Sequence, residues 1–340
     1  MQQVVDAPAQ TRIHPAYERG GAAPVYRDLS IFSGSAHPEL AHAVCRYLGV
    51  PLGRAELVKF SNENIFPKIN QNVREHDVFL IQPTYPNVSD SIMELLLMVD
   101  AFKRASASRI TVVVPYFSYG RSDKKDQPRV PISARLLADV IQAAGANRML
   151  TVDLHAGQVQ GFFNIPVDEL TAMHLLCDYI RGMELVDPVV VAGDLGFAKR
   201  ARNFANLIGA SVAFVEKRRM GNDSRSEQLG VIGEVRNKTA IVIDDEVDTA
   251  GSIVGAADIV MRSGARDVYA ACTHALLTGP AVERLRASPI REIIATDTVA
   301  RGPEKQLANL RSLSVSLLLG EAISRIHTGE SVGALFGAPV

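Results

Sequence analysis

Residues 241–252, IVIDDEVDTAGS, place four carboxylates within five residues directly after a run of β-forming residues. Mutual repulsion disfavours such a cluster unless the charges face solvent, shift their pKa values, or meet a cation or a hydroxyl-rich ligand. Asp244 and Asp245 could accept hydrogen bonds from vicinal hydroxyl groups or face a hydrated metal ion. The small-residue turn at residues 249–252 can hold one anion with its backbone N–H groups at the start of a helix. The pattern therefore favours a phosphorylated pentose as ligand.

An isolated acidic cluster is more often a solvated loop in which an aspartate caps an ordinary helix. The apolar strand before this cluster and the small-residue turn after it weaken that alternative. Ligands of open α/β sheets bind beyond the carboxyl ends of the strands, and charged residues follow other predicted strands as well. They are residues 121–125 after VVVPYF, His155 after RMLTVDL, Asp194 after PVVVAG, and residues 217–219 after SVAFVE.

The elements that must position these residues alternate along the chain, with short β-rich runs separated by amphipathic segments from Ile31 onward. This alternation predicts parallel sheets covered by helices on both faces. Residues 144–156 (AGANRMLTVDLHA) and 263–275 (SGARDVYAACTHA) match without gaps at a spacing of 119. Helix–glycine–strand junctions resemble one another in any α/β protein, but the alternation in both halves favours duplication of an α/β domain.

We place the domain boundary near Pro166, with residues 30–165 in the first domain and 166–325 in the second. Residues 1–29 form a loosely ordered extension, and residues 310–340 can pack back on the first domain. The 340 residues carry 36 Lys and Arg against 37 Asp and Glu, so no overall field favours nucleic acid or membranes. Three separated cysteines, no apolar run long enough to span a membrane and no signal-like N-terminus predict a cytoplasmic protein.

The strand and turn of residues 241–252 resemble the phosphoribosyl diphosphate motif of type I phosphoribosyltransferases and ribose-phosphate diphosphokinases. The stretches VVVPYFSYGRSDKK, RVPISARLLADV, TVDLHAGQVQGFFNIPVD, VEKRR and THALLTG resemble the diphosphokinase, over about residues 32–336. The resemblance implies two phosphoribosyltransferase-like domains, in agreement with the duplication. It also implies an enzyme that transfers the diphosphoryl group of ATP, with Mg²⁺, to the C1 hydroxyl of ribose 5-phosphate, and that assembles into homo-oligomers, commonly hexamers.

By position, the resemblance implies a set of site residues. They are Asp244, Asp245, Asp248, Thr249, Ala250, Gly251 and Ser252 for ribose 5-phosphate; Phe60, Asn62, Asn64, Arg121, Ser122, Asp123 and His155 for ATP; His155 and Asp194 for the metal; and Lys217 and Arg219 as catalytic cations. Glu246 has no assigned role. Asn62 and Asn64 stand where the family often has acids, and Ser122 where it has glutamine, so the nucleotide preference stays open. His274 ends the strand equivalent to that of His155.

Two other functions remain open. A type I phosphoribosyltransferase would consume phosphoribosyl diphosphate, but the second domain and the VDLHAG and EKRR stretches argue against it. A catalytically silent regulatory subunit would be expected to lose catalytic-loop or sugar-site residues, whereas Lys217, Arg219 and the turn are present. No general base is obvious; Asp244 and Asp245 are the candidates.

Overall fold

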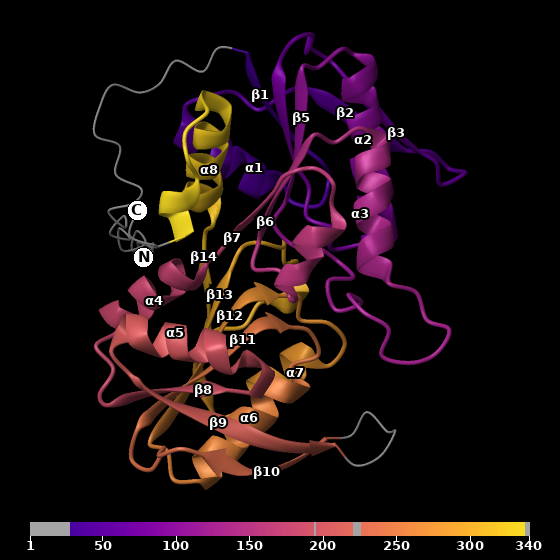
Figure 1. Ribbon diagram of the computed structural model, residues 1–340. Helices are drawn as coiled ribbons and strands as arrows, with labels where there is room; N and C mark the ends of the chain where they lie inside the picture. The colour runs from indigo at the N-terminus through magenta and orange to yellow at the C-terminus, as the bar shows by residue number, and fades with distance from the viewer. Residues whose placement is uncertain (1–27, 194, 220–225, 337–340) are drawn as a thin grey trace, which may run out of the picture.

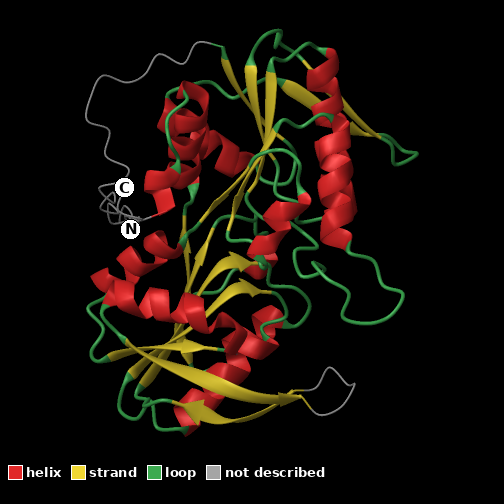
Figure 2. Ribbon diagram, viewed as in Figure 1, coloured by secondary structure: helices red, strands yellow, loops and turns green. Residues whose placement is uncertain are grey.

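The described residues of this computed structural model, 28–193, 195–219 and 226–336, form two largely parallel sheets with helices on both faces (Figures 1 and 2). A separate antiparallel hairpin, β2 (Ala55–Lys59) and β3 (Ile65–Ile69), projects from the edge of the upper part in Figure 1. The fold is the α/β class expected from the alternation of β-rich and amphipathic segments.

The first sheet has the order β1-β4-β5-β6-β7, and all its pairs are parallel. Its central strands are continuous apolar runs because helices cover both faces. α2 and α3 cover one face, and α1 and the C-terminal helix α8 (Ser316–Thr328) cover the other. The elements are β1 (Leu29–Ser33), α1 (Pro38–Leu48), β4 (Asp77–Ile81), α2 (Val88–Arg104), β5 (Arg109–Val114), α3 (Ser133–Ala144), β6 (Arg148–Val152), η2 (Gly157–Phe162) and β7 (Val167–Leu170).

The second sheet has the order β10-β9-β8-β11-β12-β13-β14, parallel except for the β9–β10 pair. α4 and α5 cover one face, and α6 and α7 cover the other. The elements are α4 (Met173–Gly182), β8 (Pro188–Ala192), η3 (Leu195–Phe197), α5 (Ala198–Ile208), β9 (Ser211–Arg219), β10 (Ser226–Ile232), β11 (Thr239–Val247), α6 (Gly251–Arg262), β12 (Asp267–Ala275), α7 (Ala281–Arg286), β13 (Ile290–Thr296), η4 (Pro303–Lys305), β14 (Leu310–Leu313), α8 (Ser316–Thr328) and η5 (Gly333–Phe336).

The side chains of β11 alternate between the two faces of the second sheet. Val242 packs in the core beneath α6, whereas Ile241 and Ile243 pack in the core beneath α4 and α5. Because the side-chain period of a strand is two residues, the same alternation sends Asp245 and Glu246 to opposite sides of the strand. The end of β11 therefore presents carboxylates in two directions.

The two sheets have equivalent central strands, which supports the duplication. β6 lies between β5 and β7, and β12 lies between β11 and β13. Arg148 of β6 pairs with Thr111 of β5, just as Asp267 of β12 pairs with Thr239 of β11. Arg148 and Asp267 are 119 residues apart, which is the spacing that relates the two matching segments.

The helix α8 leaves the second sheet and packs beside α1 on the first (Figure 1). At its end, His327 Nδ1 lies 2.8 Å from Asp77 Oδ2, and Arg109 Nε donates to Asp77 Oδ1 at 2.8 Å. The boundary expected near Pro166 precedes β7, which pairs with β6 and belongs to the first sheet. We therefore propose a boundary after Leu170, with α8 as part of the cover of the first sheet.

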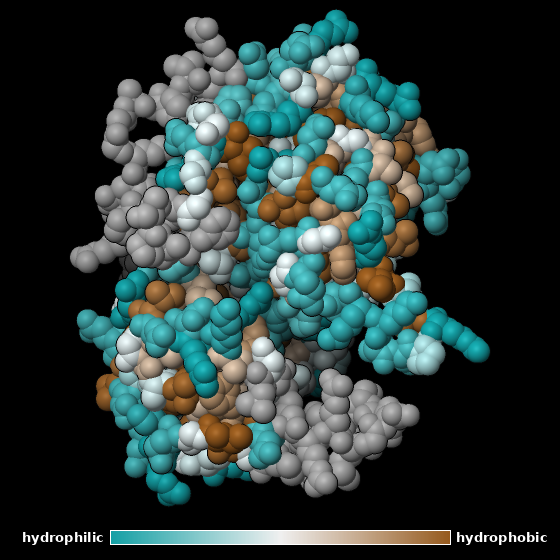
Figure 3. Space-filling model, viewed as in Figure 1, coloured by the Kyte–Doolittle hydropathy of each residue, from teal (hydrophilic) through white to brown (hydrophobic). Residues whose placement is uncertain are grey.

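The face of the molecule drawn in Figure 3 is mixed in polarity. On the face seen in Figure 3, hydrophilic side chains are interspersed with small hydrophobic patches. Within the described ranges, no helix has both the length and the apolar character needed to cross a bilayer.

Candidate active site

The carboxyl ends of the central strands of both sheets meet between the two halves of the molecule. After β6, His155 Nδ1 lies 2.7 Å from Asp245 Oδ2 of β11. His274 of β12 donates from Nε2 to the carbonyl oxygen of Asp153 at 3.1 Å, and Thr273 Oγ1 donates to Asp153 Oδ2 at 2.7 Å. The loop that carries His155 is thus fixed from the second sheet, which brings the two sets of strand-end residues together.

The pair of His155 and Asp245 is the strongest electrostatic feature of this region. Burial opposes ionisation of Asp245, but hydrogen bonds with His155 and Asp244 and the charge of His155 hold its pKa well below the usual range. The hydrogen bond to Asp245 raises the pKa of His155 against the opposing effect of burial. An ionised carboxylate only accepts, so the Nδ1–H of His155 donates, and Nε2 of the neutral ring has a lone pair available to a cation.

The turn after β11 is held by the loop that follows β12 and by the helix α7 after that loop. The Thr278 hydroxyl donates to Asp248 Oδ1, and the backbone N–H of Thr278 donates to the Asp248 carbonyl at 2.9 Å. Arg284 Nη1 donates to the carbonyl oxygen of Thr249 at 2.9 Å. Ala250 has φ +60°, in the left-handed region, and Gly251 begins α6. The first N–H groups of α6, which lack intrahelical partners, therefore start at the small-residue turn.

This turn lines a hollow of about 350 Å³, which we call the turn hollow. Its lining combines the amino end of α6 with hydroxyl groups, carboxylates and one guanidinium. The lining residues are Arg121, Asp244, Glu246, Val247, Asp248, Thr249, Ala250, Gly251, Ser252 and Ile253. An anion that carries hydroxyl groups fits this set, because the amino end of a helix attracts the anion and carboxylates accept from hydroxyls.

A second hollow of about 390 Å³ lies against the loops after β5 and β6, and we call it the loop hollow. Its lining residues are Tyr116, Phe117, Tyr119, Gly120, Arg121, Val152, Asp153, Leu154, His155, Glu246 and His274. Arg121 and Glu246 line both hollows, so the two adjoin. Arg121 Nη2 lies 3.4 Å from Glu246 Oε1, and Nη1 lies 3.9 Å from Asp248 Oδ2.

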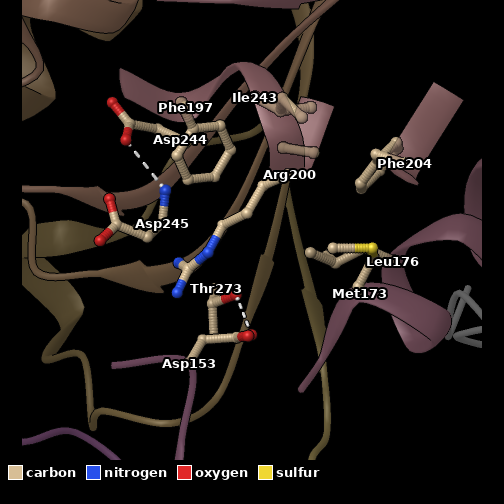
Figure 4. A pocket seen from close by; sticks show the side chains of 11 residues that line it. Asp153, Met173, Leu176, Phe197, Arg200, Phe204, Ile243, Asp244, Asp245 and Thr273 are labelled. Atoms are coloured by element: carbon tan, nitrogen blue, oxygen red, sulfur yellow. Dashed lines mark hydrogen bonds between the residues drawn. The ribbon is translucent and has the colours of Figure 1, made fainter. Parts of the chain in front are cut away.

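A third hollow of about 350 Å³ lies behind the first two carboxylates of the acidic run (Figure 4). Asp153, Thr273, Asp244 and Asp245 give it a polar side, and the side chain of Arg200 from α5 extends into the same region (Figure 4). Arg200 Nη2 donates to the carbonyl oxygen of Leu154 at 2.8 Å, next to His155. Met173, Leu176, Phe197, Phe204, Ile243 and Ala271 complete the lining.

The structure brings together much of the site expected from the sequence. Arg121, His155, Asp244, Asp245 and residues 248–252 all lie around the two adjoining hollows or contact a residue that does. Asp123 is buried and accepts from Gln158 Nε2 at 2.5 Å, and the Ser122 N–H donates to the Tyr119 carbonyl at 2.8 Å. Their contacts shape the loop after β5 rather than the lining of either hollow.

Other expected residues lie elsewhere. Phe60, Asn62 and Asn64 are exposed at the tip of the β2–β3 hairpin and line neither hollow. Asp194 lies outside the described residues, as do the side chains of Lys217 and Arg219, although the backbone of β9 is described through residue 219.

Three residues around the site have no place in the sequence-based set. Tyr116 lines the loop hollow, Thr278 holds Asp248, and Arg200 reaches the loop before His155. Tyr116 lies in VVVPYF and Thr278 in THALLTG. Both stretches carry the family resemblance, but no role was predicted for these two positions. His274, in contrast, is buried, and burial lowers its pKa. Its contact with Asp153 is a structural tie between the two halves.

Two sheets joined at their carboxyl ends, with an acidic strand end followed by a small-residue turn at the start of a helix, define a phosphoribosyltransferase-like α/β protein. A family model described as the N-terminal domain of ribose phosphate pyrophosphokinase matches residues 29–145, and one described as a phosphoribosyl synthetase-associated domain matches residues 220–337. The chain belongs to the ribose phosphate pyrophosphokinase family.

Individual relatives are similar over nearly their whole length. The ribose-phosphate pyrophosphokinase of Clostridium perfringens is 46% identical over 313 residues, covering 91% of this chain and 98% of the relative. That of Bacillus subtilis is 44% identical over 310 residues, with 91% and 98% covered. A crystal structure of phosphoribosylpyrophosphate synthetase from Mycobacterium smegmatis superposes with a TM-score of 0.84 at 40% identity, covering 89% of this chain and 100% of that chain.

Proposed function

We propose that this protein transfers the diphosphoryl group of ATP, bound with magnesium, to the C1 hydroxyl of ribose 5-phosphate. The products are 5-phosphoribosyl 1-diphosphate and AMP. Family membership supports this reaction, and one observation in the structure carries it: the turn hollow and the loop hollow adjoin through Arg121 and Glu246. A sugar phosphate in one and a nucleotide in the other would meet at that junction.

Ribose 5-phosphate occupies the turn hollow in this proposal. Its phosphate lies on the backbone of residues 249–252, with the Thr249 and Ser252 hydroxyls and the amino end of α6 as donors. Asp244, which also lines the turn hollow, accepts from the ribose hydroxyls. The backbone N–H of Asp245 donates to Asp244 Oδ1 at 2.9 Å and orients that carboxylate. The C1 hydroxyl then faces the loop hollow.

ATP occupies the loop hollow, with its phosphates near Arg121 and His155. In the described part of the chain, no group of three or more His, Cys, Asp or Glu side chains is placed to hold a metal ion. Mg²⁺ is commonly held by one or two protein groups together with substrate phosphates. His155 and Asp194 are the proposed protein ligands, and the ion would neutralise charge on the phosphoryl oxygens.

Lys217 and Arg219, at the end of β9, supply the catalytic cations. Attack of the C1 hydroxyl on the β-phosphorus spreads negative charge over phosphoryl oxygens, so positioning and fixed positive charge do most of the catalytic work. Removal of one such cation is expected to lower kcat by about 10²- to 10³-fold, by analogy with single oxyanion-hole donors.

The adenine site requires a second subunit in this proposal. Phe60, Asn62 and Asn64 are exposed on the hairpin, away from both hollows of their own chain. In a homo-oligomer, expected to be a hexamer built from dimers, they would contact the adenine bound to a neighbouring copy. A cytoplasmic location fits the substrates and the three buried free cysteines.

The test is AMP release from ATP and Mg²⁺ in the presence and absence of ribose 5-phosphate. We expect release that depends on both the sugar phosphate and the metal and that stops with a chelator. Release that ignores ribose 5-phosphate, or none at all from folded protein, would refute the proposal. Consumption of phosphoribosyl diphosphate with a free base would instead indicate a phosphoribosyltransferase. Light scattering of the purified protein measures the oligomer.

A further inference from the structure

Glu246 is a buried carboxylate at the junction of the two hollows. It is 8% exposed, and it lines both hollows together with Arg121. Alternation along β11 turns the side chain of Asp245 toward His155 and that of Glu246 to the opposite side of the strand, where it meets the loop after β5. There it has two polar neighbours, the guanidinium of Arg121 at 3.4 Å and the phenol of Tyr116, which shares a hydrogen bond with it.

The ionised form of Glu246 is disfavoured at this buried position. Burial raises the pKa of Glu246, and the neighbouring Asp245 and Asp248 raise it further, while the charge of Arg121 opposes them. Both hollows suit phosphates. The negative charge of Glu246 would repel a bound phosphate unless a cation lies between the carboxylate and the phosphate. Arg121 is a cation beside Glu246, with Nη2 toward Glu246 and Nη1 toward Asp248, and it lines both hollows.

The contacts of Arg121 with the two carboxylates are long, whereas Tyr116, the other neighbour of Glu246, is packed against two rings. The distances of 3.4 and 3.9 Å to the two carboxylates exceed a normal hydrogen bond, and half of the Arg121 side chain is exposed. Tyr116, in contrast, is packed edge-on against His274 with ring centroids 5.1 Å apart and against Tyr85 at 6.2 Å. Glu246 is buried and its backbone pairs with His274 of β12, so it can orient a cation that still has donors for phosphate oxygens.

We propose that Glu246 is a positioning residue that holds the Arg121 guanidinium at the junction of the two hollows, where phosphoryl groups of nucleotide and sugar phosphate meet. The inference rests on the proposed function and extends it to a residue with no place in the sugar-binding motif. Tyr116 orients the Glu246 carboxylate through the hydrogen bond between the two side chains. A purely stabilising role is disfavoured because an ion pair with a half-exposed arginine contributes little to stability.

The test is a double-mutant cycle between Glu246→Gln and Arg121→Met. The glutamine keeps the shape of Glu246 and removes its charge. In the wild-type background we expect Glu246→Gln to lower kcat/KM for ATP roughly tenfold, within the range of coupling in one ion-pair network. In the Arg121→Met background the same change should have less than a twofold effect, because its target is gone. Losses that multiply in the double variant would overturn the proposal.

Glu292 provides a matched control. It accepts from the Tyr179 hydroxyl at 2.7 Å and lies 3.6 Å from Arg311 Nε, so it has the same two kinds of partner away from both hollows. Glu292→Gln is expected to leave kcat/KM unchanged. Tyr116→Phe should lower kcat/KM in the same direction as Glu246→Gln but less, and it too should lose its effect when Arg121 is methionine.

A measurement of ATP binding tests this inference independently of the proposed reaction. The dissociation constant of ATP with Mg²⁺, measured by calorimetry across the same four proteins, requires no turnover. Wild-type protein that binds ATP and shows the non-additive cycle supports positioning by Glu246 even if ribose 5-phosphate is not its acceptor. Additive changes in the dissociation constant overturn the inference even if the wild type synthesises phosphoribosyl diphosphate. Equal melting temperatures of the four proteins confirm that folding is not the cause.

Discussion

Gly251→Ala is expected to separate ligand binding from folding at the turn after β11. Gly251 is the first residue of α6 and lines the turn hollow. A Cβ added there would lie 3.3 Å from Arg284 Nη1, the far end of a flexible side chain, and 3.9 Å from Thr249 Oγ1. The fold can accommodate this methyl group by a small movement of Arg284, whereas a phosphate on the turn cannot approach the backbone as closely.

The magnitudes follow from these contacts. Where the backbone conformation suits both residues, replacing glycine by alanine stabilises by about 0.4–1 kcal/mol, so the free energy of unfolding should stay level or rise slightly. Loss of one hydrogen bond to the charged phosphate is expected to cost about 1.5–3 kcal/mol of binding. That loss corresponds to a KM for ribose 5-phosphate raised about 10- to 100-fold. The phosphate does not react, so its contacts are alike before and during reaction, and kcat should change little.

The assay is steady-state AMP release with ribose 5-phosphate varied at saturating ATP, alongside urea unfolding. Gly182→Ala is the matched control, because Gly182 ends α4 and an added Cβ there meets nothing within 4 Å. It should match Gly251→Ala in stability and wild type in KM. A folded Gly251→Ala protein with a KM within twofold of wild type would refute the placement of the phosphate on this turn.

Three further predictions concern other parts of the molecule. Asp245→Asn should lower the free energy of unfolding by about 1 kcal/mol near pH 5 and by less near pH 9, a modest value because His155 is partly exposed. The sign follows because the raised pKa of His155 gives stability present below its ordinary value of 6.5 and lost as pH rises, and the lowered pKa of Asp245 gives stability present above 3.8. Equal losses in urea unfolding at both pH values would contradict it. Lys217→Ala should lower kcat about 10²- to 10³-fold with an unchanged circular dichroism spectrum, and unchanged turnover would remove Lys217 from catalysis. Gly34→Ala should destabilise by about 1–3 kcal/mol in thermal unfolding, because its Cβ would overlap the buried Gln82 side chain; a melting temperature equal to wild type would show that Gln82 moves aside.

The local parts of the site were predictable from the sequence. Four apolar residues before Asp244 indicate a buried strand, and a small-residue turn after it indicates the start of a helix, which is what β11 and α6 show. The duplication was also predictable, because the 119-residue spacing matches register in equivalent strands. In these cases the signal lies within a few consecutive residues, or in a repeat of them.

The contacts between distant segments were not predictable in the same way. Nothing near Glu246 in the sequence indicates Arg121, which lies 125 residues earlier and reaches it only because the two sheets meet end to end. Arg200 contacts the carbonyl of Leu154 for the same reason. The sequence does not indicate which sheet β7 joins, because a strand of four residues beside a proline carries little periodic signal; we propose the boundary after it because it pairs with β6.

The position of α8 also has a consequence for how the chain acquires its structure on the ribosome. The first sheet is translated before the second, yet Phe79 and Ile31 on one of its faces are covered partly by Leu319 and Ile323 of α8, which emerges after every strand of both sheets. That apolar face stays partly uncovered while the whole second sheet is synthesised. Exposed apolar surface of this kind promotes aggregation. Protection of the nascent first half is therefore expected from chaperones or from transient cover by other segments, until release of α8 from the ribosome completes the cover of the first sheet.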